Sequence, residues 1–271
     1  MFKINNLTYQ YDKTRKALDN VSMDFNKGNI IGIIGSNGSG KSTLFNNLMG
    51  ILKSTEGEIL YNGEQIKYDK KSLYNLRKEV GIVFQDPEKQ IFYSMVYDDI
   101  AFALRNIGID EKTIKERIHT ALEAVNGLQF IDRPVHNLSF GQKKRVAIAS
   151  VVAMENKLVL LDEPTAGLDP ISTRAIVDII KGLNKRGVKI VISSHDMNLI
   201  YEICDYVYVL NQGVLINEGT REEVFINEEK IDEAGLELPW LVKLHKNMGL
   251  PLFPKEEDLY SYWNHREQKT V

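Results

Sequence analysis

The sequence predicts an α/β protein built around a parallel sheet that helices cover. Four short runs rich in Ile, Val and Leu lack polar alternation, which is typical of strands buried on both faces of a parallel sheet. Helical patterns lie between the runs, and this alternation indicates βαβ units. Each run leads into polar residues, which should meet at the edge formed by the carboxyl ends of the strands. The four runs are residues 29–35, 79–84, 158–161 and 188–194.

Other patterns predict the remaining elements. Alternating segments at residues 2–11, 18–25 and 57–63 indicate an antiparallel β layer near the N-terminus. Residues 206–219 indicate a hairpin that turns at residues 211–213. The clearest helical patterns cover residues 41–52, 111–125, 174–183 and 197–204.

We expect residues 1–225 to form one domain, into which a helical lobe at about residues 88–157 is inserted. Residues 226–271 are predicted to form a small helical C-terminal extension. Within it, Pro239 suits the start of a helix whose apolar side chains share one face. We expect that face to be buried, either on the chain's own core or in a dimer contact. Its members are Trp240, Leu241, Leu244 and Met248.

The composition is that of an ordinary soluble globular protein. A net charge of −3 argues against a nucleic-acid-binding surface or attraction to an anionic membrane. The single cysteine, Cys204, excludes an internal disulfide and favours a reducing compartment. The first residues lack the charged and apolar regions of a signal peptide, and no apolar run approaches the roughly 18 residues that span a bilayer. We therefore expect a protein that does not enter a membrane by itself.

Residues Gly35–Thr43 match the phosphate-binding pattern G-x-x-x-x-G-K-[ST] between a predicted strand and a predicted helix. The glycines let backbone N–H groups turn inward around an anion, and the helix points its positive end there. We expect Lys41 to reach the β- and γ-phosphates of a nucleotide and the Ser42 hydroxyl to bind Mg²⁺. The predicted binding residues of this P-loop are Gly35, Ser36, Asn37, Gly38, Ser39, Gly40, Lys41, Ser42 and Thr43.

Four polar residues follow the other predicted strands. Asp162 is predicted to support Mg²⁺, and its neighbour Glu163, which points the other way on extended chain, is predicted to activate water. His195 should reach the γ-phosphate or the attacking water. The Gln85 amide can bind either the metal or the water.

Six motifs, in this order, resemble those of an ABC ATPase over about residues 2–225. The resemblance implies ATP as the nucleotide with Mg²⁺, and ATP hydrolysis with Glu163, His195 and Gln85 as catalytic residues. It also implies that Tyr11 stacks on the adenine, with Tyr9 as the alternative. The motifs are the P-loop at 35–43, Gln85 of the Q-loop, LSFGQ at 138–142, the Walker B segment LVLLDE at 158–163, AGLD at 166–169 as the D-loop, and His195 as the switch histidine.

The signature stretch LSFGQKKR at residues 138–145 holds no catalytic group. Ser139 and Gln142 are placed to cap the start of a helix. Because ABC ATPases pair head to tail, the resemblance implies that Ser139, Gly141 and Gln142 close on the ATP of a second subunit. Phe140 stands where the family usually has glycine, and its side chain must point away from the nucleotide.

Residues 83–102 and 234–249 resemble a narrower group, the energy-coupling-factor ATPases of the CbiO/EcfA type. This implies a peripheral subunit at the cytoplasmic face of the cell membrane that drives import of a metal ion (cobalt or nickel) or a vitamin. The implied partners are a second ATPase subunit, identical or a sister chain, a membrane T component and a substrate-binding S component. A groove for a helix of the T component is predicted beside Ile91, Phe92, Tyr93 and Tyr97, with Asp98 and Asp99 at its rim facing cations of the partner.

The alternative is a soluble ABC ATPase that acts on nucleic acid or ribosomes. Those proteins resemble tandem pairs of ATPase domains or heads on long coiled coils. This chain has one set of motifs, no sustained heptads and no basic stripe, so no nucleic-acid partner is expected. A P-loop kinase or GTPase would not explain LSFGQ or AGLD.

Overall fold

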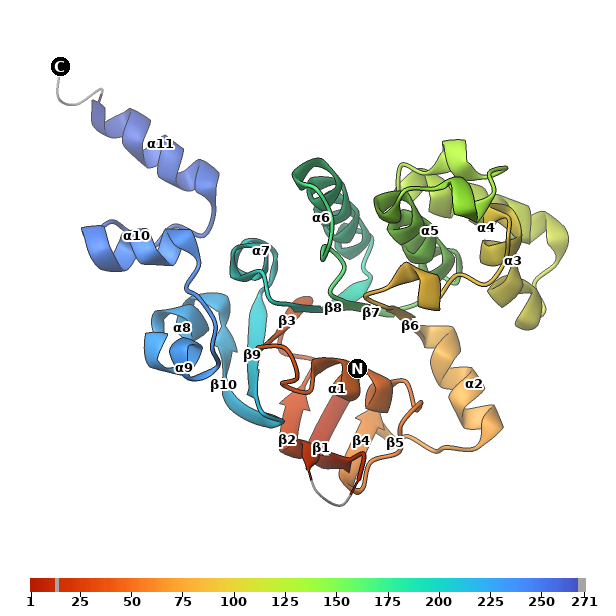
Figure 1. Ribbon diagram of the computed structural model, residues 1–271, viewed down its shortest axis with the longest axis horizontal. Helices are drawn as coiled ribbons and strands as arrows, with labels where there is room; N and C mark the ends of the chain where they lie inside the picture. The colour runs from red at the N-terminus through yellow and green to blue at the C-terminus, as the bar shows by residue number, and fades with distance from the viewer. Residues whose placement is uncertain (13–14, 268–271) are drawn as a thin grey trace.

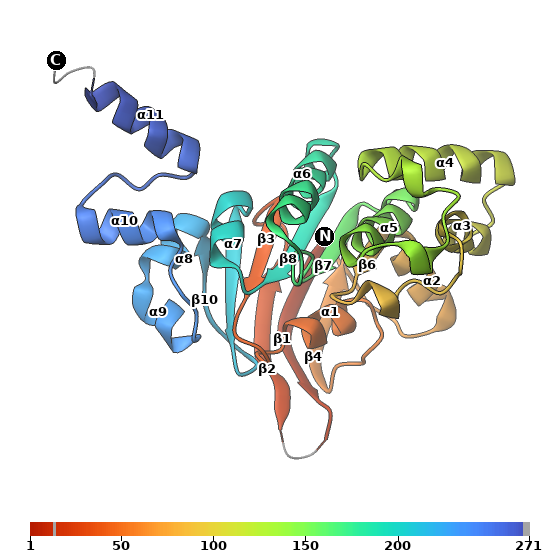
Figure 2. The same ribbon diagram turned by 45° about the horizontal axis from the view of Figure 1, so that its top comes forward.

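A computed structural model describes residues 1–12 and 15–267, and residues 13–14 and 268–271 lie outside this description. Figure 1 shows a central sheet with a second sheet below it, a helical lobe at one end and the C-terminal helices at the other. Figure 2 shows the same separation of the two ends from another angle. The predicted α/β class, with its antiparallel layer and helical lobe, is confirmed.

The smaller sheet is antiparallel and forms the predicted N-terminal β layer. Its strands, in spatial order, are β2 (Lys16–Asp24), β1 (Phe2–Gln10), β4 (Glu56–Tyr61) and β5 (Glu64–Gln65).

The larger sheet has six strands, and the four apolar runs form its adjacent parallel strands β3, β8, β7 and β6. The predicted hairpin supplies the other two strands, with β9 parallel to β3 and β10 antiparallel to β9. In spatial order the strands are β10 (Val214–Thr220), β9 (Tyr206–Asn211), β3 (Ile30–Ile34), β8 (Lys189–Ser194), β7 (Leu158–Asp162) and β6 (Val80–Val83).

The helices largely follow the predicted patterns, with ends displaced by a few residues. Three short 3₁₀ turns, η1 (Pro87–Lys89), η2 (Leu128–Phe130) and η3 (Val135–Asn137), lie in the lobe with α3, α4 and α5. The helices are α1 (Lys41–Leu48), α2 (Lys70–Glu79), α3 (Val96–Asn106), α4 (Glu111–Ala124), α5 (Phe140–Ala153), α6 (Pro170–Lys185), α7 (Met197–Ile203), α8 (Arg221–Ile226), α9 (Glu228–Glu233), α10 (Trp240–Met248) and α11 (Glu256–Glu267).

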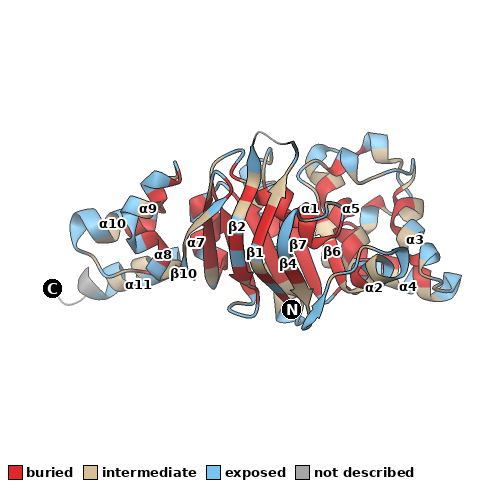
Figure 3. Cartoon of the chain, turned by 90° about the horizontal axis from the view of Figure 1, so that it is seen from below, coloured by how far each residue is buried: buried red, intermediate tan, exposed pale blue. Residues whose placement is uncertain are grey.

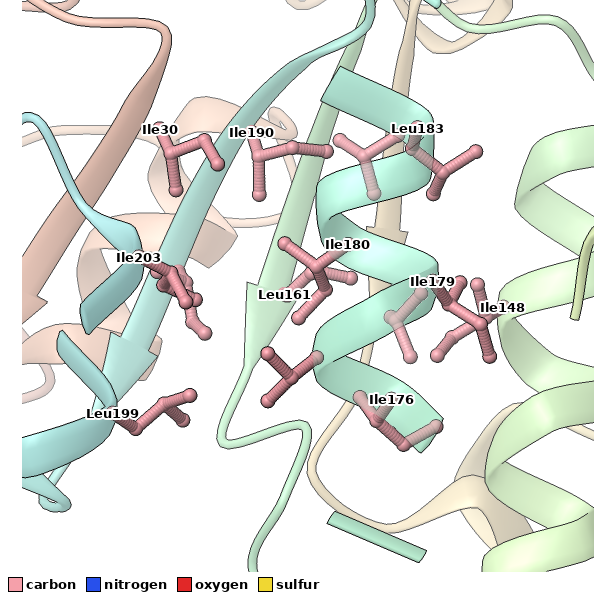
Figure 4. Packing of buried hydrophobic residues seen from close by; sticks show 14 of the residues in the cluster. Ile30, Ile148, Leu161, Ile176, Ile179, Ile180, Leu183, Ile190, Leu199 and Ile203 are labelled. Atoms are coloured by element: carbon pink, nitrogen blue, oxygen red, sulfur yellow. The ribbon is translucent and has the colours of Figure 1, made fainter. Parts of the chain in front are cut away.

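The parallel sheet is buried on both faces, and Figure 3 shows its strands as the most buried part of the chain. Ile31 and Ile33 face a cluster formed with α1 and the antiparallel sheet. Ile30 and Ile34 face the opposite cluster, formed with α6, α7 and the helical lobe. Figure 4 shows α6 packed between the sheet and Ile148 of α5. This double burial explains why these strands lack polar alternation.

The C-terminal helix α10 (Trp240–Met248) buries only part of its predicted apolar face within the single chain, so the alternative of a dimer contact stays a prediction. Leu241 is buried as expected, but Met248 is 63% exposed and Trp240 is 36% exposed. The helix instead buries Val242, which the spacing argument left out. The buried residues of α10 lie in its first turn, whereas its second half meets the rest of the chain through polar contacts of Lys246 with Ile226 and Glu228.

Candidate nucleotide-binding site

The carboxyl ends of the parallel strands surround a cavity of about 520 Å³. The strand order places the P-loop after β3 beside the residues that follow β8, β7 and β6, although these segments lie far apart in the sequence. The cavity is lined by Tyr11, Asp12, Arg15, Ala17, Asn37, Gly38, Gly40, Lys41, Ser42, Thr43, Gln85, Glu163 and His195.

The P-loop owes its shape to glycines at two left-handed positions. Gly38 has a φ of 79° and Gly40 a φ of 108°, a region that side-chain-bearing residues rarely adopt. A Cβ at Gly40 would also lie 2.7 Å from the carbonyl oxygen of Ala17. Both positions therefore need glycine, and the turn delivers the chain into the N-terminus of α1. Gly35, Ser36 and Ser39 complete the loop, where the Ser39 N–H donates to the Ser36 carbonyl at 3.1 Å.

Lys41 is 6% exposed and folds back over the loop. Its Nζ donates to the carbonyl oxygens of Gly35 at 2.7 Å and Ser36 at 3.1 Å. Burial lowers the pKa of Lys41, and the carboxylates of Glu163 and Asp162 oppose this shift. The Lys41 ammonium is thus held beside the N-terminus of α1, where an anion would bind.

The two carboxylates after β7 have different surroundings. Ser193 Oγ donates to Asp162 Oδ1 at 2.5 Å, which fixes that carboxylate against β8. Glu163 Oε2 lies 2.8 Å from His195 Nδ1, whereas its buried Oε1 has no hydrogen-bond partner among the described residues. Glu163 lines the cavity, whereas Asp162 lies behind the lining, so only Glu163 is presented to a ligand there. Sequence reasoning missed Ser193, whose only signal was its position two residues before His195.

Tyr11 stands at the open side of the cavity and is 64% exposed. Its hydroxyl lies 3.1 Å from Thr43 Oγ1, and the ring of Tyr9 meets its edge at a centroid distance of 5.0 Å. Tyr9 itself does not line the cavity. The geometry therefore favours Tyr11 over Tyr9 as the ring available to a ligand.

The signature residues lie away from this cavity at the start of α5. Ser139 Oγ accepts from the Gln142 N–H at 3.3 Å, and Gln142 Oε1 accepts from the Ser139 N–H at 3.0 Å, which is the expected capping box. Gly141 lies against the D-loop and the start of α6, where an added Cβ would be 3.4 Å from Leu168 Cδ2 and 3.2 Å from Ser172 Oγ. A single chain thus brings together the P-loop, Gln85, Glu163 and His195, but not Ser139, Gly141 and Gln142.

Lys144 is a second buried lysine that sequence reasoning missed. Only 1% exposed, it donates from Nζ to the carbonyl oxygens of Glu163 at 2.8 Å and Ala166 at 3.0 Å. Burial lowers the pKa of Lys144 to about 8 against the opposing effect of nearby carboxylates, Glu163 foremost. The sequence held one signal, since Lys144 lies four residues from both Phe140 and Ile148, on the apolar face of the helix.

In the segment after Gln85, the aromatic residues are exposed as predicted, but Asp99 is not at the rim of a groove as predicted. Phe92 is 78% exposed and Tyr93 is 44% exposed, as a docking surface requires. Asp99, however, is buried and accepts from the N–H groups of Phe92 at 2.8 Å and Tyr93 at 3.1 Å. Burial raises the pKa of Asp99, with the two N–H bonds opposing. It therefore holds the aromatic segment in place and is not free to pair with a partner's cation, whereas Asp98 lies 3.5 Å from Arg105 at the surface.

The arrangement defines a P-loop nucleotide-hydrolysing protein with a carboxylate–histidine pair facing the phosphate cradle. The family model for ABC transporters matches residues 18–166, more than half of the chain. The chain belongs to the ABC transporter family, and within it to the ATP-binding subunits of the energy-coupling-factor group. It is an ATP hydrolase.

Two relatives illustrate the group. The cobalt import ATP-binding protein CbiO of Salmonella typhimurium is 45% identical over 99% of this chain and 97% of its own length. The energy-coupling factor transporter ATP-binding protein EcfA of Methanosphaera stadtmanae is 43% identical over 92% of this chain and 89% of its own length.

Two solved structures share the fold. CbiO1 of Clostridium perfringens, part of the ABC transporter complex CbiONQ, superposes with a TM-score of 0.78 at 41% identity and covers 90% of this chain and 98% of its own. A dimeric bacterial ABC transporter cassette superposes with a TM-score of 0.74 at 27% identity and covers 82% of this chain and 99% of its own.

Proposed function

We propose that this chain powers the import of a metal ion, cobalt or nickel, or of a vitamin, by binding and hydrolysing ATP beneath a membrane transporter. The observation that carries the proposal is the single cavity onto which Lys41, Gln85, Glu163 and His195 all open. The names of its relatives, a cobalt import protein and an energy-coupling-factor subunit, support the cargo class. No feature favours the alternative of a soluble ATPase that acts on nucleic acid or ribosomes.

In this proposal the P-loop binds the ATP phosphates. Backbone N–H groups of residues 36–43 and the N-terminus of α1 face them, and the Lys41 ammonium exchanges its two carbonyl partners for β- and γ-phosphate oxygens. The adenine stacks on the ring of Tyr11, which is exposed and fixed at its hydroxyl by Thr43. The cavity thereby orients the γ-phosphate toward Glu163.

The donor set of the site fits Mg²⁺. Hard oxygen ligands are what this ion prefers, and it normally takes only one or two protein groups together with phosphates and water. Ser42 and Gln85 line the cavity, and the Asp162 carboxylate, next in the chain to the lining residue Glu163, is fixed by Ser193. When bound there, Mg²⁺ would neutralise charge on the β- and γ-phosphates.

Glu163 is the proposed general base. Its Oε1 is buried without a partner among the described residues, so it is available to accept a hydrogen bond from a water molecule in line with the γ-phosphate. His195 Nδ1 holds the other oxygen at 2.8 Å, and His195 lines the same cavity as Lys41. Water activation and phosphate contact thus fall to neighbouring side chains.

The remaining side of the γ-phosphate is left to a second subunit, identical or a sister chain. The Ser139 hydroxyl and the start of α5 are exposed, and they lie outside the chain's own cavity. A dimeric cassette among the similar structures supports pairing of two such chains. Ser139, Gly141 and Gln142 would then cover the partner's ATP with hydroxyl and N–H donors.

Mixing two inactive variants tests this shared site. Lys41→Ala subunits paired with Ser139→Arg subunits give one position with both lesions and one with neither. We expect ATP hydrolysis to return in purified mixed dimers, while each variant alone stays inactive. Mixed dimers that form, as shown by two affinity tags, and yet hydrolyse no ATP would exclude head-to-tail pairing.

The exposed aromatic segment is the proposed docking site for a helix of the membrane T component. Gln90 Oε1 accepts from the Phe84 N–H at 3.1 Å, and Gln90 Nε2 donates to the Ala147 carbonyl at 3.1 Å. The stretch that carries Gln85 and the aromatic residues is therefore tied to the lobe helix α5. Movement at the γ-phosphate can reach the docking site through this short path.

Replacing Phe92 and Tyr93 by alanine tests the docking site. We expect ATP hydrolysis by the isolated subunit to stay within about two-fold of the unchanged protein, because both side chains are exposed and the ring that Tyr93 contacts, Phe102, is itself 42% exposed. Assembly with the membrane components and uptake should be lost. The matched control is Tyr74→Ala, which removes a 41% exposed aromatic ring from α2. Equal loss of hydrolysis and assembly would mean that the two rings support the fold.

The proposed location is the cytoplasmic face of the cell membrane, with a substrate-binding S component in the complex. Among the described residues, no helix is both long and apolar enough to cross a membrane. Purification from membranes under mild detergent, followed by identification of the co-purifying integral proteins, tests the partners and names the cargo class.

A further inference from the structure

Lys144 has no role in the mechanism above, yet it is only 1% exposed on the signature helix α5. Its ammonium is buried and bonded to two carbonyl oxygens of the turn that follows β7, those of Glu163 and Ala166. One of these carbonyls belongs to the proposed general base. Lys144 itself lies five residues beyond Ser139, on the first turns of α5.

The backbone of Glu163 needs support. Its φ is 46°, a left-handed conformation that a non-glycine residue keeps only when its surroundings hold it. On the amino side, the Glu163 N–H donates to the carbonyl and hydroxyl oxygens of Ser193, each at 3.1 Å. On the carboxyl side, Lys144 holds the carbonyl. The direction of the Glu163 carboxylate is thus set by β8 on one side and by the signature helix on the other.

Phe140 completes this contact. Residues 140 and 144 share a face of the helix, and the Phe140 ring centroid lies 5.4 Å from the Lys144 Nζ. A Cβ added at Gly167 would be 3.5 Å from the same ring, so the Phe140 ring lies over the D-loop. The ring shields the ammonium and adds a favourable cation–π contact.

The neighbouring lysine provides a natural comparison. Lys143 is one position earlier on the helix and points to a different segment, where its Nζ meets Glu88 of η1 at 2.5 Å. The Lys143 side chain is 16% exposed and the Glu88 side chain is 65% exposed. An ion pair whose carboxylate is this exposed contributes little to stability. Because the Lys143 ammonium bonds to Glu88 and not to the turn after β7, Lys143 is a control for Lys144 on the same helix.

We propose that Lys144, covered by Phe140, is a positioning residue that couples the two ATP sites of the dimer. Each Lys144 joins the Glu163 of its own site to the signature helix that serves the other site. A shift of the signature helix on its partner's ATP is thereby passed to the Glu163 backbone of the same subunit. This inference rests on the proposed head-to-tail pairing.

The first test compares Lys144→Met with Lys143→Met in the full-length protein. Methionine keeps most of the apolar volume but donates no hydrogen bond. We expect kcat for ATP to fall roughly ten-fold with KM nearly unchanged, because Lys144 contacts the general base and not the nucleotide. Lys143→Met should change neither constant by more than about two-fold. Lys144→Gln, whose amide can still donate, should recover part of kcat and serves if the methionine variant does not fold.

A kcat within about two-fold of the unchanged protein in both folded Lys144 variants would overturn the proposal. So would a rise in KM with an unchanged kcat, since that pattern belongs to a residue that supports nucleotide binding. The thermal unfolding temperature of each variant shows whether the protein is folded under the assay conditions, and so whether a loss of activity comes only from unfolding.

The second test separates coupling from simple support of Glu163. In the mixed dimer of Lys41→Ala and Ser139→Arg subunits, the intact site uses Glu163 from the Ser139→Arg subunit and the signature from the Lys41→Ala subunit. We expect Lys144→Met to lower hydrolysis whichever subunit carries it. Loss confined to one placement would overturn coupling. If the parent mixed dimer has no activity, head-to-tail pairing fails and the coupling proposal falls with it, whatever the kcat result of the first test.

Discussion

Lys41→Ala is expected to lose ATP binding and hydrolysis together. The Lys41 ammonium is buried, is held by two carbonyls of the P-loop and is the only lysine side chain that lines the described cavity. A hydrogen bond to a charged group contributes about 1.5–3 kcal/mol, so ATP affinity should fall roughly 10- to 150-fold. Hydrolysis should fall to background because the charge that develops on the phosphates has lost its partner.

Titration of a fluorescent ATP analogue and a phosphate-release assay measure the two effects. The control is Lys157→Ala, which removes an ion pair with Glu79 at the opposite edge of the same sheet. Its affinity for ATP should match that of the unchanged protein. If Lys41→Ala binds ATP as tightly as that control, the P-loop assignment is wrong.

Glu163→Gln is expected to separate binding from hydrolysis. The amide keeps the size of the side chain and still hydrogen-bonds to His195, but it cannot accept a proton from water. Loss of a general base lowers the rate by about 10²–10⁴-fold, whereas the contacts to phosphate stay in place. ATP should therefore accumulate uncleaved, and with it a closed dimer.

Single-turnover kinetics give the rate, and sedimentation with and without ATP gives the dimer. Glu202→Gln provides the comparison, since it neutralises an exposed carboxylate that pairs with Lys181 away from the site. Near-normal turnover by Glu163→Gln would show that Glu163 is not the general base, and His195 would then be the next residue to test in that role.

Sequence patterns predicted the parts of the fold that local chemistry controls. The apolar runs around Ile31 and Leu160 predicted buried strands because both of their faces are covered. The hairpin turn was predictable because Gln212 and Gly213 both adopt positive φ, which such two-residue turns require. The P-loop was predictable for the same kind of reason, since its backbone has positive φ at Gly38 and Gly40, which favours glycine.

Contacts between distant segments were not predictable in this way. Lys144 and Glu163 lie nineteen positions apart, and their contact depends on how α5 packs beside β7. Asp99 was expected at a rim because it is charged, yet the fold gave it two backbone N–H groups and buried it. Met248 was expected to be buried, either on the chain's own core or in a dimer contact, and the single chain leaves it 63% exposed, so the dimer contact stays a prediction. For Lys144 and Asp99, tertiary packing overrode the tendency of the residue.

The position of β3 in the sheet has a consequence for the order in which the protein is made. β3 carries the P-loop, but its two neighbours are β8 and β9, so Ile31 pairs with Val191 and Tyr206. A ribosome adding about 5–20 residues per second produces those partners roughly 10–30 seconds after β3. Until then, one of the most apolar strands of the chain has no neighbours in its sheet, and the phosphate-binding loop that follows it has no fixed base. The nucleotide site is therefore completed late in synthesis, and in the interval this apolar strand is a place where the nascent chain is prone to aggregate.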